Sequence, residues 1–410
     1  MNTSKLTRRN ALKTVAGSAG LLLVSPGRLI AEAAEEPLFG LRERFPSPVK
    51  IASVELLRRD QYDFVRVTSS DGATGTVLAS ERMAYLHPIF LQRVAPYFVG
   101  KDARDLESLV DGVYVHQSNY KLAGLALWVC VGCLEFAILD LLGKSAGVSI
   151  GELMEGVVRR EIPIYLSSMR RDTTPEQEVA WLSERLTETG AKAVKLKIGG
   201  RMSRNADASP GRTERLVPLA RKTFGDSITL QVDANGSYDP AKAIEVGRML
   251  RDHGVYFFEE PCPWEDFEAT KQVADALEIP VAGGEQDTSY AKFRWMVRNR
   301  AVDIVQPDVI YNGGLIRTSR VARLAAAAKM DITPHAPQPG YHAAYMLHFA
   351  SVTPNLGRFQ EYPAARFEQP SWYGPQIQVR NGAVRVPNGP GIGITIDAKF
   401  LEKAESLGRC

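Results

Sequence analysis

Ionisable side chains recur at nearly constant spacing through the second half of this 410-residue chain. Successive members are 23 to 27 residues apart, and they are Asp233, Glu259, Glu285, Asp308, His335 and Glu361. Two lysines, Lys195 and Lys197, precede the set. Carboxylates are ligands for hard divalent cations such as Mg²⁺, and lysine and histidine can exchange protons with a substrate. These residue types suit metal-assisted acid–base chemistry, provided that the fold gathers them in one place.

The elements that must position these residues are short apolar runs, each ending in a polar residue. Eight runs follow one another, at residues 162–168, 193–197, 228–235, 255–261, 279–285, 302–308, 330–335 and 357–363. Helix-like patterns separate them, and this alternation predicts an α/β fold with a (β/α)8, TIM-like barrel over residues 160–385. In such barrels the catalytic groups lie at the C-terminal ends of the strands, which is where the ionisable residues fall.

Three acidic residues, Asp233, Glu259 and Glu285, end successive predicted strands, so their carboxylates should converge at one side of the barrel mouth. Without a cation they would repel one another and raise their own pKa values. Oxygen-only ligands favour Mg²⁺ over zinc or copper, which predicts a Mg²⁺ site. Asn235, on the same face as Asp233, could add an oxygen or contact the substrate. A salt-bridged rim without metal is disfavoured, because no arginine ends a neighbouring strand.

Lys195 and Lys197 are two residues apart in one predicted strand and therefore share a face. Burying ammonium groups without partners is costly, but this strand precedes the carboxylate strands, so both lysines should flank the same cavity. Two neighbouring ammonium groups also depress each other's pKa. We expect Lys197, nearer the mouth, to act as a general base and Lys195, one layer deeper, to be its electrostatic partner.

His335 ends the strand two beyond that of Glu285, so it should face Lys197 across the mouth. Asp308 ends the strand between, and an aspartate beside a histidine fixes its tautomer and stabilises its charged form. The alternative for His335 is an ordinary loop histidine. Glu361 ends the eighth strand, close to Lys197 in a closed ring. It is either a hydrogen-bond donor to the substrate, if its pKa is raised, or a salt-bridge partner of one of the lysines.

The chain on either side of the barrel has a different pattern. Residues 48–155 combine alternating, antiparallel-type strands around a DG turn with helix-like segments, which predicts a smaller α+β capping domain. Residues 386–410 hold a strand and a short helix that should return to this domain. Cys130 and Cys133 form a CxxC inside an apolar, helix-like run, and without a second pair we expect core cysteines rather than a zinc site.

Residues 1–33 resemble a twin-arginine export signal, with Arg8 and Arg9 before an apolar stretch too short for a membrane span. Small residues suit cleavage near Ala33, and we expect a periplasmic protein; the alternative is a disordered basic N-terminus. The formal charge is +3, but without the leader 45 basic and 46 acidic residues remain, a net charge of −1. We therefore expect no nucleic-acid partner, and no later segment looks transmembrane.

The ordered motifs KLK, DAN, EEP, GGE, PD followed by NGG, PH and QEYP resemble those of the enolase superfamily, mandelate racemase subgroup. The resemblance covers nearly everything after the leader. The resemblance implies that Asp233, Glu259 and Glu285 are the metal ligands. It implies that Lys197 is one acid/base group and that His335, paired with Asp308, is the other. Lys195 and Glu361 would stabilise the enolate. The common step that it implies is removal of the proton α to a carboxylate, whose dianionic enolate needs a metal and cations around it.

Three functions fit these residues. We expect a Mg²⁺-dependent acid-sugar dehydratase, in which Lys197 or His335 removes the α proton and His335 as imidazolium assists departure of the β hydroxyl, giving a 2-keto-3-deoxy acid. The second hypothesis is a racemase or epimerase with the same residues, in which the opposite base returns the proton. The third is a non-catalytic periplasmic binder of acid sugars. Relatives of this kind are often octamers or dimers, so the resemblance also implies a homo-oligomer.

Overall fold

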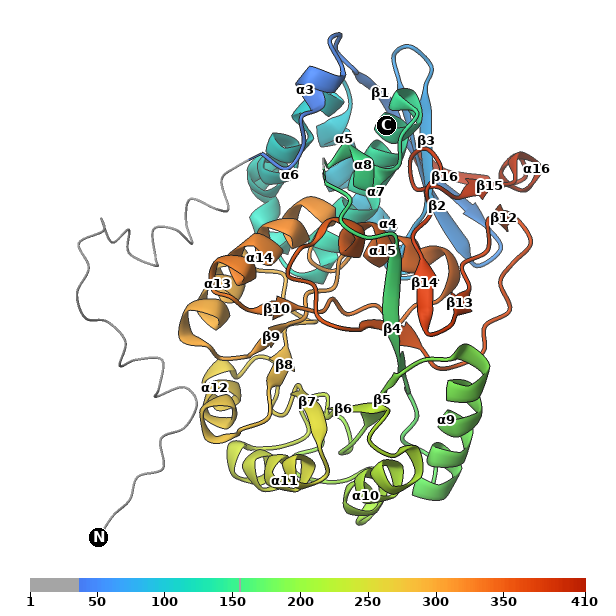
Figure 1. Ribbon diagram of the computed structural model, residues 1–410. Helices are drawn as coiled ribbons and strands as arrows, with labels where there is room; N and C mark the ends of the chain where they lie inside the picture. The colour runs from blue at the N-terminus through green and yellow to red at the C-terminus, as the bar shows by residue number, and fades with distance from the viewer. Residues whose placement is uncertain (1–36, 155) are drawn as a thin grey trace, which may run out of the picture.

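The described chain has two parts, an N-terminal domain above a ring of strands and helices (Figure 1). The structure is a computed structural model, and it describes residues 37–154 and 156–410. The export signal predicted for residues 1–33 lies outside the described residues.

One layer of the N-terminal domain is a four-stranded antiparallel sheet in the order β16-β1-β2-β3. Its strands are β1 (Ile51–Arg59), β2 (Tyr62–Ser69), β3 (Thr74–Leu78) and β16 (Glu405–Arg409). The DG turn joins β2 to β3: the Ser69 amide donates to the Ala73 carbonyl at 2.9 Å, and Gly72 takes a φ of 88°, which glycine adopts without strain. Because β16 pairs with β1, the C-terminal tail returns to this domain.

Helices form the rest of this domain. They are α3 (Leu41–Arg44), α4 (Met83–Ile89), α5 (Ala95–Phe98), α6 (Leu106–Val115), α7 (Leu125–Ala146) and α8 (Ile150–Leu153), with a π-helical turn η1 (Phe90–Val94) and 3-10 turns η2 (Ala103–Asp105) and η3 (His116–Leu122). Helix α7 packs against β2 and β3. Its length and composition would let it cross a membrane, but 89% of its most apolar 18-residue stretch is buried inside the fold. Cys130 and Cys133 on α7 are buried free thiols, which confirms them as core residues.

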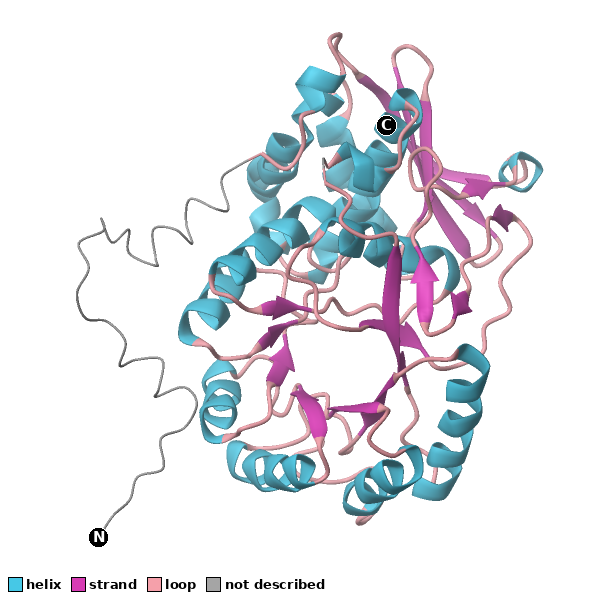
Figure 2. Cartoon of the chain, viewed as in Figure 1, coloured by secondary structure: helices cyan, strands magenta, loops and turns pink. Residues whose placement is uncertain are grey.

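Eight parallel strands form the second part. They are β4 (Glu161–Ser167), β5 (Ala193–Lys197), β6 (Thr229–Asp233), β7 (Val255–Glu259), β8 (Val281–Gly283), β9 (Ile304–Val305), β10 (Asp331–Ile332) and β11 (Gln360–Pro363). Pairing runs in chain order from β4 to β10, and β11 pairs with β4. Ile332 of β10 also forms a parallel bridge with Leu356, shortly before β11. The strands surround one axis with helices outside (Figure 2), and the eight-stranded barrel with its cap is confirmed.

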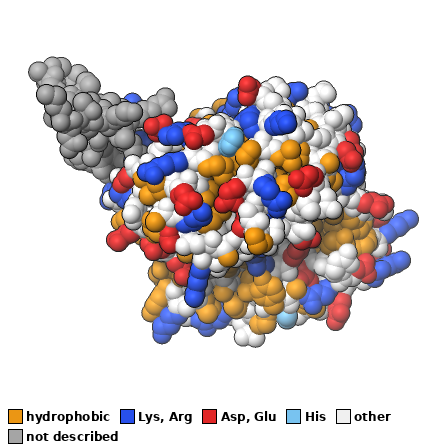
Figure 3. Space-filling view, turned by 90° about the horizontal axis from the view of Figure 1, so that it is seen from below, with side chains coloured by type: hydrophobic (Ala, Val, Ile, Leu, Met, Phe, Trp, Pro, Cys, Tyr) orange, Lys and Arg blue, Asp and Glu red, His pale blue; other side chains and the backbone are white. Residues whose placement is uncertain are grey.

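The helices between these strands are α9 (Pro175–Thr189), α10 (Arg212–Phe224), α11 (Pro240–Asp252), α12 (Phe267–Ala276), α13 (Tyr290–Asn299), α14 (Leu315–Ala327) and α15 (Ala343–Val352), the last preceded by a 3-10 turn η4 (Gly340–His342). Local signals set their ends. In α9, Thr174 and Gln177 form a capping box, and Gly190 ends the helix with a φ of 70°. On the face seen in Figure 3, acidic and basic side chains are interspersed.

After β11, the described chain continues in short strands where an eighth barrel helix would stand. These elements are β12 (Tyr373–Gly374), β13 (Val379–Arg380), β14 (Ala383–Arg385), β15 (Thr395–Ile396) and α16 (Ala398–Leu401). Strand β14 pairs with β13 and with β4, so this segment is attached to the barrel wall. Inside the barrel, Tyr165 and Phe257 are buried with ring centroids 6.3 Å apart, so side chains occupy the space enclosed by the ribbons.

Glu135 of α7 links the two parts at the start of α14. The N-cap of α14 is Gly314, which offers no capping side chain. Oε1 of Glu135 instead accepts a hydrogen bond from the Ile316 amide at 3.1 Å. Burial raises the pKa of this carboxyl to about 8, although the amides at the start of α14 act in the opposite direction. The N-terminal domain therefore caps a barrel helix with a group that holds its proton near neutral pH.

We predict that Glu135→Gln changes how stability depends on pH. The unfolded chain releases this proton near pH 4.3, whereas the folded chain keeps it up to about pH 8. Wild-type stability should therefore fall as pH rises between these values, and the free energy of unfolding of the Gln variant should rise relative to wild type from pH 5 to pH 9 in urea titrations. Relative to the Gln variant, Glu135→Ala, which leaves the Ile316 amide without its acceptor, should cost about 1–3 kcal/mol at both pH values. A pH-independent difference between Gln and wild type would contradict the assignment.

Candidate metal centre and active site

The parallel register of three strands aligns the predicted site residues at one end of the barrel. Lys197, Asp233 and Glu259 are the last residues of β5, β6 and β7, and each is paired directly with the next. Glu285 follows β8 by two residues. Since side chains two apart share a face, Lys195 lies one layer below Lys197. The structure thus brings together residues that are up to 90 positions apart in sequence.

The three carboxylates form a group that fits a divalent cation. Asp233, Glu259 and Glu285 each place one oxygen within 4.8 Å of the others. All three side chains are almost completely buried. Buried carboxylates at this separation are the donor set of a hard cation, which takes oxygen ligands at about 2.0–2.6 Å. The residues predicted as metal ligands therefore lie together, and their chemistry fits the ion that the sequence implies.

Lys195 is the fully buried cation of the site. Its Nζ lies 2.8 and 2.9 Å from the two carboxylate oxygens of Glu259 and 2.8 Å from Oε1 of Glu361. Burial opposes its charge, but attraction to Glu259 and Glu361 outweighs burial and places its pKa well above the ordinary value. The expectation that the two lysines depress each other's pKa is therefore wrong for Lys195, because carboxylates surround it more closely than the second ammonium group does.

Lys197 is held on the first of the carboxylates. Its Nζ donates to Oδ2 of Asp233 and lies 3.3 Å from Oδ1 of Asn235. The pKa of Asp233 is lowered even though burial would raise it, because Lys197 and Lys195 attract its charged form. A buried amine beside the carboxylates of the candidate metal site has the surroundings of an acid/base group.

His335 and Asp308 form the predicted dyad. Nδ1 of His335 lies 2.8 Å from Oδ2 of Asp308, whose other oxygen accepts from the amides of Ile310 and Tyr311. On the opposite side of the ring, Nε2 lies 3.3 Å from Oε2 of Glu285. Burial lowers the pKa of His335, but the nearby acids, Glu285 foremost, outweigh it and raise the pKa to about 10. The Nε2 atom therefore faces the carboxylate group while Nδ1 is anchored by Asp308.

Glu361 accepts hydrogen bonds, so the prediction that it donates one to the substrate is not supported. Oε1 pairs with Lys195 at 2.8 Å, and Oε2 accepts from the Ala336 amide at 2.8 Å. Burial would raise its pKa, but Lys195 and His335 hold the pKa well below the ordinary value. The alternative considered from the sequence, a salt bridge to one of the lysines, is the arrangement in the structure. Glu361 thus fixes Lys195 rather than donating a proton.

Asn235 turns its oxygen toward cations. Oδ1 accepts from Nη2 of Arg171 at 2.8 Å, as well as facing Lys197. Its amide group lies 3.4 Å from Oε2 of Glu260. Asn235 therefore joins the cationic side of the site to the carboxylates, and its side-chain oxygen is not among those that converge on the candidate metal position.

Sequence reasoning missed three residues around this site. Arg171 supplies a cation beside Asp233 from the loop four positions beyond β4, although, as expected, no arginine ends a neighbouring strand. Nε2 of Gln306 donates to Oε2 of Glu259 at 2.9 Å. Nη1 of the fully buried Arg212 donates to the backbone carbonyl of Lys197 at 2.9 Å. Gln306 lies inside a predicted strand and Arg171 is in the arginine pair after the first strand, but neither pattern indicates which residue they contact.

Comparison with known proteins agrees with this geometry. Residues 38–155 match the family described as mandelate racemase / muconate lactonizing enzyme, N-terminal domain, and residues 177–400 match the family described as enolase C-terminal domain-like. The D-galactarolactone cycloisomerase of Agrobacterium fabrum is 30% identical over 376 residues, covering 88% of this chain and 95% of that protein. The arabinonate dehydratase of Saccharolobus solfataricus is 28% identical over 348 residues, covering 82% and 88%.

A solved structure is also similar over most of the chain. It is that of a mandelate racemase/muconate lactonizing protein from Paracoccus denitrificans complexed with magnesium. The TM-score is 0.79 at 27% sequence identity, and the similarity covers 88% of this chain and 99% of that one.

We predict that a divalent cation stabilises the folded chain through the three carboxylates. MgCl₂ at one hundred times its dissociation constant should add about 3 kcal/mol to the free energy of unfolding, since the ion binds the assembled site and not the unfolded chain. Glu285→Gln should remove most of the resulting rise in Tm, measured by calorimetry with and without MgCl₂. Glu278→Gln, at a carboxylate 75% exposed, is the matched control. An equal rise in the Glu285 variant would contradict the site.

Proposed function

The chain belongs to the mandelate racemase / muconate lactonizing enzyme family of the enolase superfamily, and on that premise we propose that it is an acid-sugar dehydratase. It would remove the proton α to the carboxylate of a sugar acid and expel the β hydroxyl as water. The enol that forms would then tautomerise to a 2-keto-3-deoxy acid. Relatives named as dehydratases, such as the arabinonate dehydratase, support this choice of reaction.

The observation that carries the proposal is the placement of two proton-transfer groups on either side of the carboxylate triad. Lys197 Nζ contacts Asp233 at one end of the triad, and His335 Nε2 lies 3.3 Å from Glu285 at the other end. A substrate carboxylate held at the triad would have one group on each face of its α carbon. Proton removal and hydroxyl departure require two such groups, because one accepts a proton while the other donates one.

Two cations, Mg²⁺ and Lys195, would stabilise the developing enolate. Mg²⁺, held by Asp233, Glu259 and Glu285, would supply the positive charge that stabilises the developing enolate; the magnesium bound by the Paracoccus relative supports this ion. Lys195, held charged by Glu259 and Glu361, adds a fixed cation that needs no reorganisation during the reaction.

Lys197 would accept the α proton and His335 would donate a proton to the leaving hydroxyl. The acids around His335 favour its imidazolium form, which is the form that donates. Asp308 holds the ring by Nδ1 and leaves Nε2 to face the substrate. If His335 instead returned a proton to the α carbon, the same residues would perform racemisation, so the two reactions differ only in the atom that receives the proton.

We predict that single substitutions separate the two proton transfers. In D₂O with MgCl₂ and a panel of aldonic and aldaric acids, wild type should release 2-keto acid. His335→Asn should still exchange the α proton for deuterium but form keto acid about 10²- to 10⁴-fold more slowly, and Lys197→Ala should lose both exchange and product by a similar factor. These rates can be followed by NMR.

Lys192→Ala is the matched control, since Lys192 is an exposed lysine one residue before the same strand. Deuteration with inversion and no keto acid would support the racemase. Binding of acid sugars without exchange or product, unaffected by either site substitution, would leave only a binding protein.

We also propose that the chain is exported to the periplasm by the twin-arginine route, from the twin arginines and the apolar stretch that follows them. Replacing Arg8 and Arg9 together by lysine should leave the full-length precursor in the cytoplasm, as measured by cell fractionation. Arg28→Lys, in the same leader, should not change export. Unaltered processing of the double variant would count against the proposal.

A further inference from the structure

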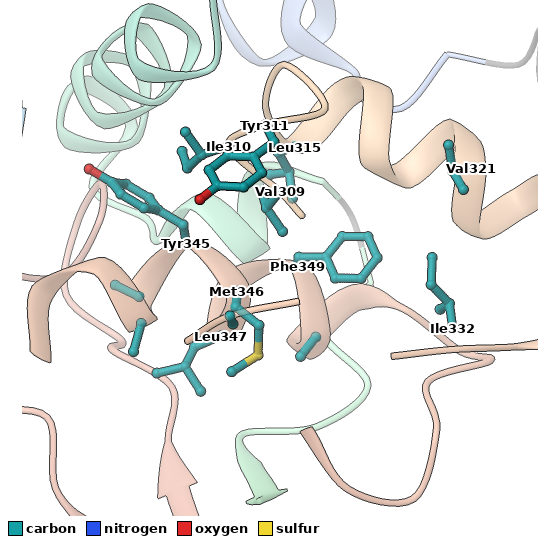
Figure 4. Packing of buried hydrophobic residues seen from close by; sticks show 14 of the residues in the cluster. Val309, Ile310, Tyr311, Leu315, Val321, Ile332, Tyr345, Met346, Leu347 and Phe349 are labelled. Atoms are coloured by element: carbon teal, nitrogen blue, oxygen red, sulfur yellow. The ribbon is translucent and has the colours of Figure 1, made fainter. Parts of the chain in front are cut away.

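A cavity of about 370 Å³ lies between the N-terminal domain and the barrel. This size is in the range of small-molecule sites. The cavity is lined by both members of the dyad, His335 and Asp308, so it extends away from the reacting centre on the histidine side. Tyr311, after β9, and Tyr345, on α15, form part of its wall, and Figure 4 shows both among the buried hydrophobic residues of this part of the molecule. A substrate bound at the triad would reach into this space with its far end.

Arg82 brings a positive charge to the cavity wall from the N-terminal domain. Its Nη2 donates to the hydroxyl of Tyr311 and its Nη1 to that of Tyr85, both at 2.8 Å. The guanidinium carbon lies 4.7 Å from the centre of the Tyr311 ring, a cation–π contact. The same ring lies 5.9 Å from the ring of His335. One tyrosine thus separates Arg82 from the catalytic histidine and holds the guanidinium in place.

In the described part of the chain, no carboxylate oxygen lies within 4.0 Å of the Arg82 guanidinium. The ion pairs formed there all involve other cations. The guanidinium donates to two phenols and has five N–H donors, so donors remain for a ligand. Glu81 also lines the cavity but is exposed and makes no ion pair with Arg82. Burial lowers the pKa of His342 on the same wall, which favours the neutral form of its imidazole.

We propose that Arg82 binds a second carboxylate at the end of the substrate remote from the reacting carbon, so that the preferred substrates are sugar diacids. The inference rests on the proposed function, because it takes the reacting carboxylate to lie at the triad. A guanidinium matches the geometry of a carboxylate and forms paired, charge-assisted hydrogen bonds with it. A sugar monoacid ends in a neutral hydroxymethyl group, which leaves the charge of Arg82 uncompensated.

The test compares substrates that differ only at the far end. Galactarate and galactonate, and glucarate and gluconate, are matched pairs in which a carboxylate replaces a hydroxymethyl group. With the full chain and MgCl₂, the diacid should have the higher kcat/KM within the pair that reacts. Arg82→Gln should lower the ratio of diacid to monoacid kcat/KM about 10- to 100-fold, chiefly through KM. Arg82→Lys, which keeps the charge without the paired donors, should lie between.

Glu81→Gln is the matched control on the same segment, and it should leave this ratio unchanged or raise it, since it removes a negative charge near the bound diacid. An equal loss for diacid and monoacid in Arg82→Gln, a similar fall of the ratio in Glu81→Gln, or a wild-type preference for monoacids would overturn the proposal.

Calorimetric titration with the same four acids keeps the inference testable if none of them reacts. The proposed dehydratase function would then lack support, while a diacid preference in Kd that Arg82→Gln abolishes would still establish the binding role. Equal Kd values for diacid and monoacid in wild type would refute that role.

Discussion

The site depends on a balance of charges that are buried together. Lys195 is completely inside the barrel and is tolerated there only because Glu259 and Glu361 contact it from two strands. Removing ions from water costs several kcal/mol per ion unless partners and hydrogen bonds compensate. Neither side of this arrangement is stable without the other. The parallel register that places Lys197 beside Asp233, and Asp233 beside Glu259, is what makes the balance possible.

The two parts of the molecule contribute different residues to the candidate active site. The barrel supplies the candidate metal ligands and the proposed proton-transfer groups from the ends of its strands, where an eight-stranded ring holds them on rigid backbone. The N-terminal domain supplies Arg82 to the cavity next to His335 and caps α14 with Glu135. Chemistry and surroundings therefore come from separate stretches of sequence. Such a division lets one barrel reaction be applied to different acids through changes outside the barrel.

The strands, their order and the candidate metal ligands were predictable because each depends on local information. A short apolar run followed by a polar residue and a helix repeats along the chain, and a barrel places every such polar residue at one end. Pairing of charges was not predictable in the same way. Glu361 pairs with Lys195 rather than donating a proton, and Lys195 is more basic than expected. Arg171 enters from a loop, whose path no periodic pattern describes.

By itself, the sequence determined the class of fold and the set of residues that could do chemistry, because hydrophobic period and residue type are properties of short segments. It also placed Asp308 and His335 on consecutive strands, which was sufficient to predict their contact. Only the tertiary structure decided which ion pairs form and which group faces the cavity. Those outcomes depend on distances of a few ångströms between residues far apart in the chain, since electrostatic attraction in a buried site changes steeply with separation and with exclusion of water.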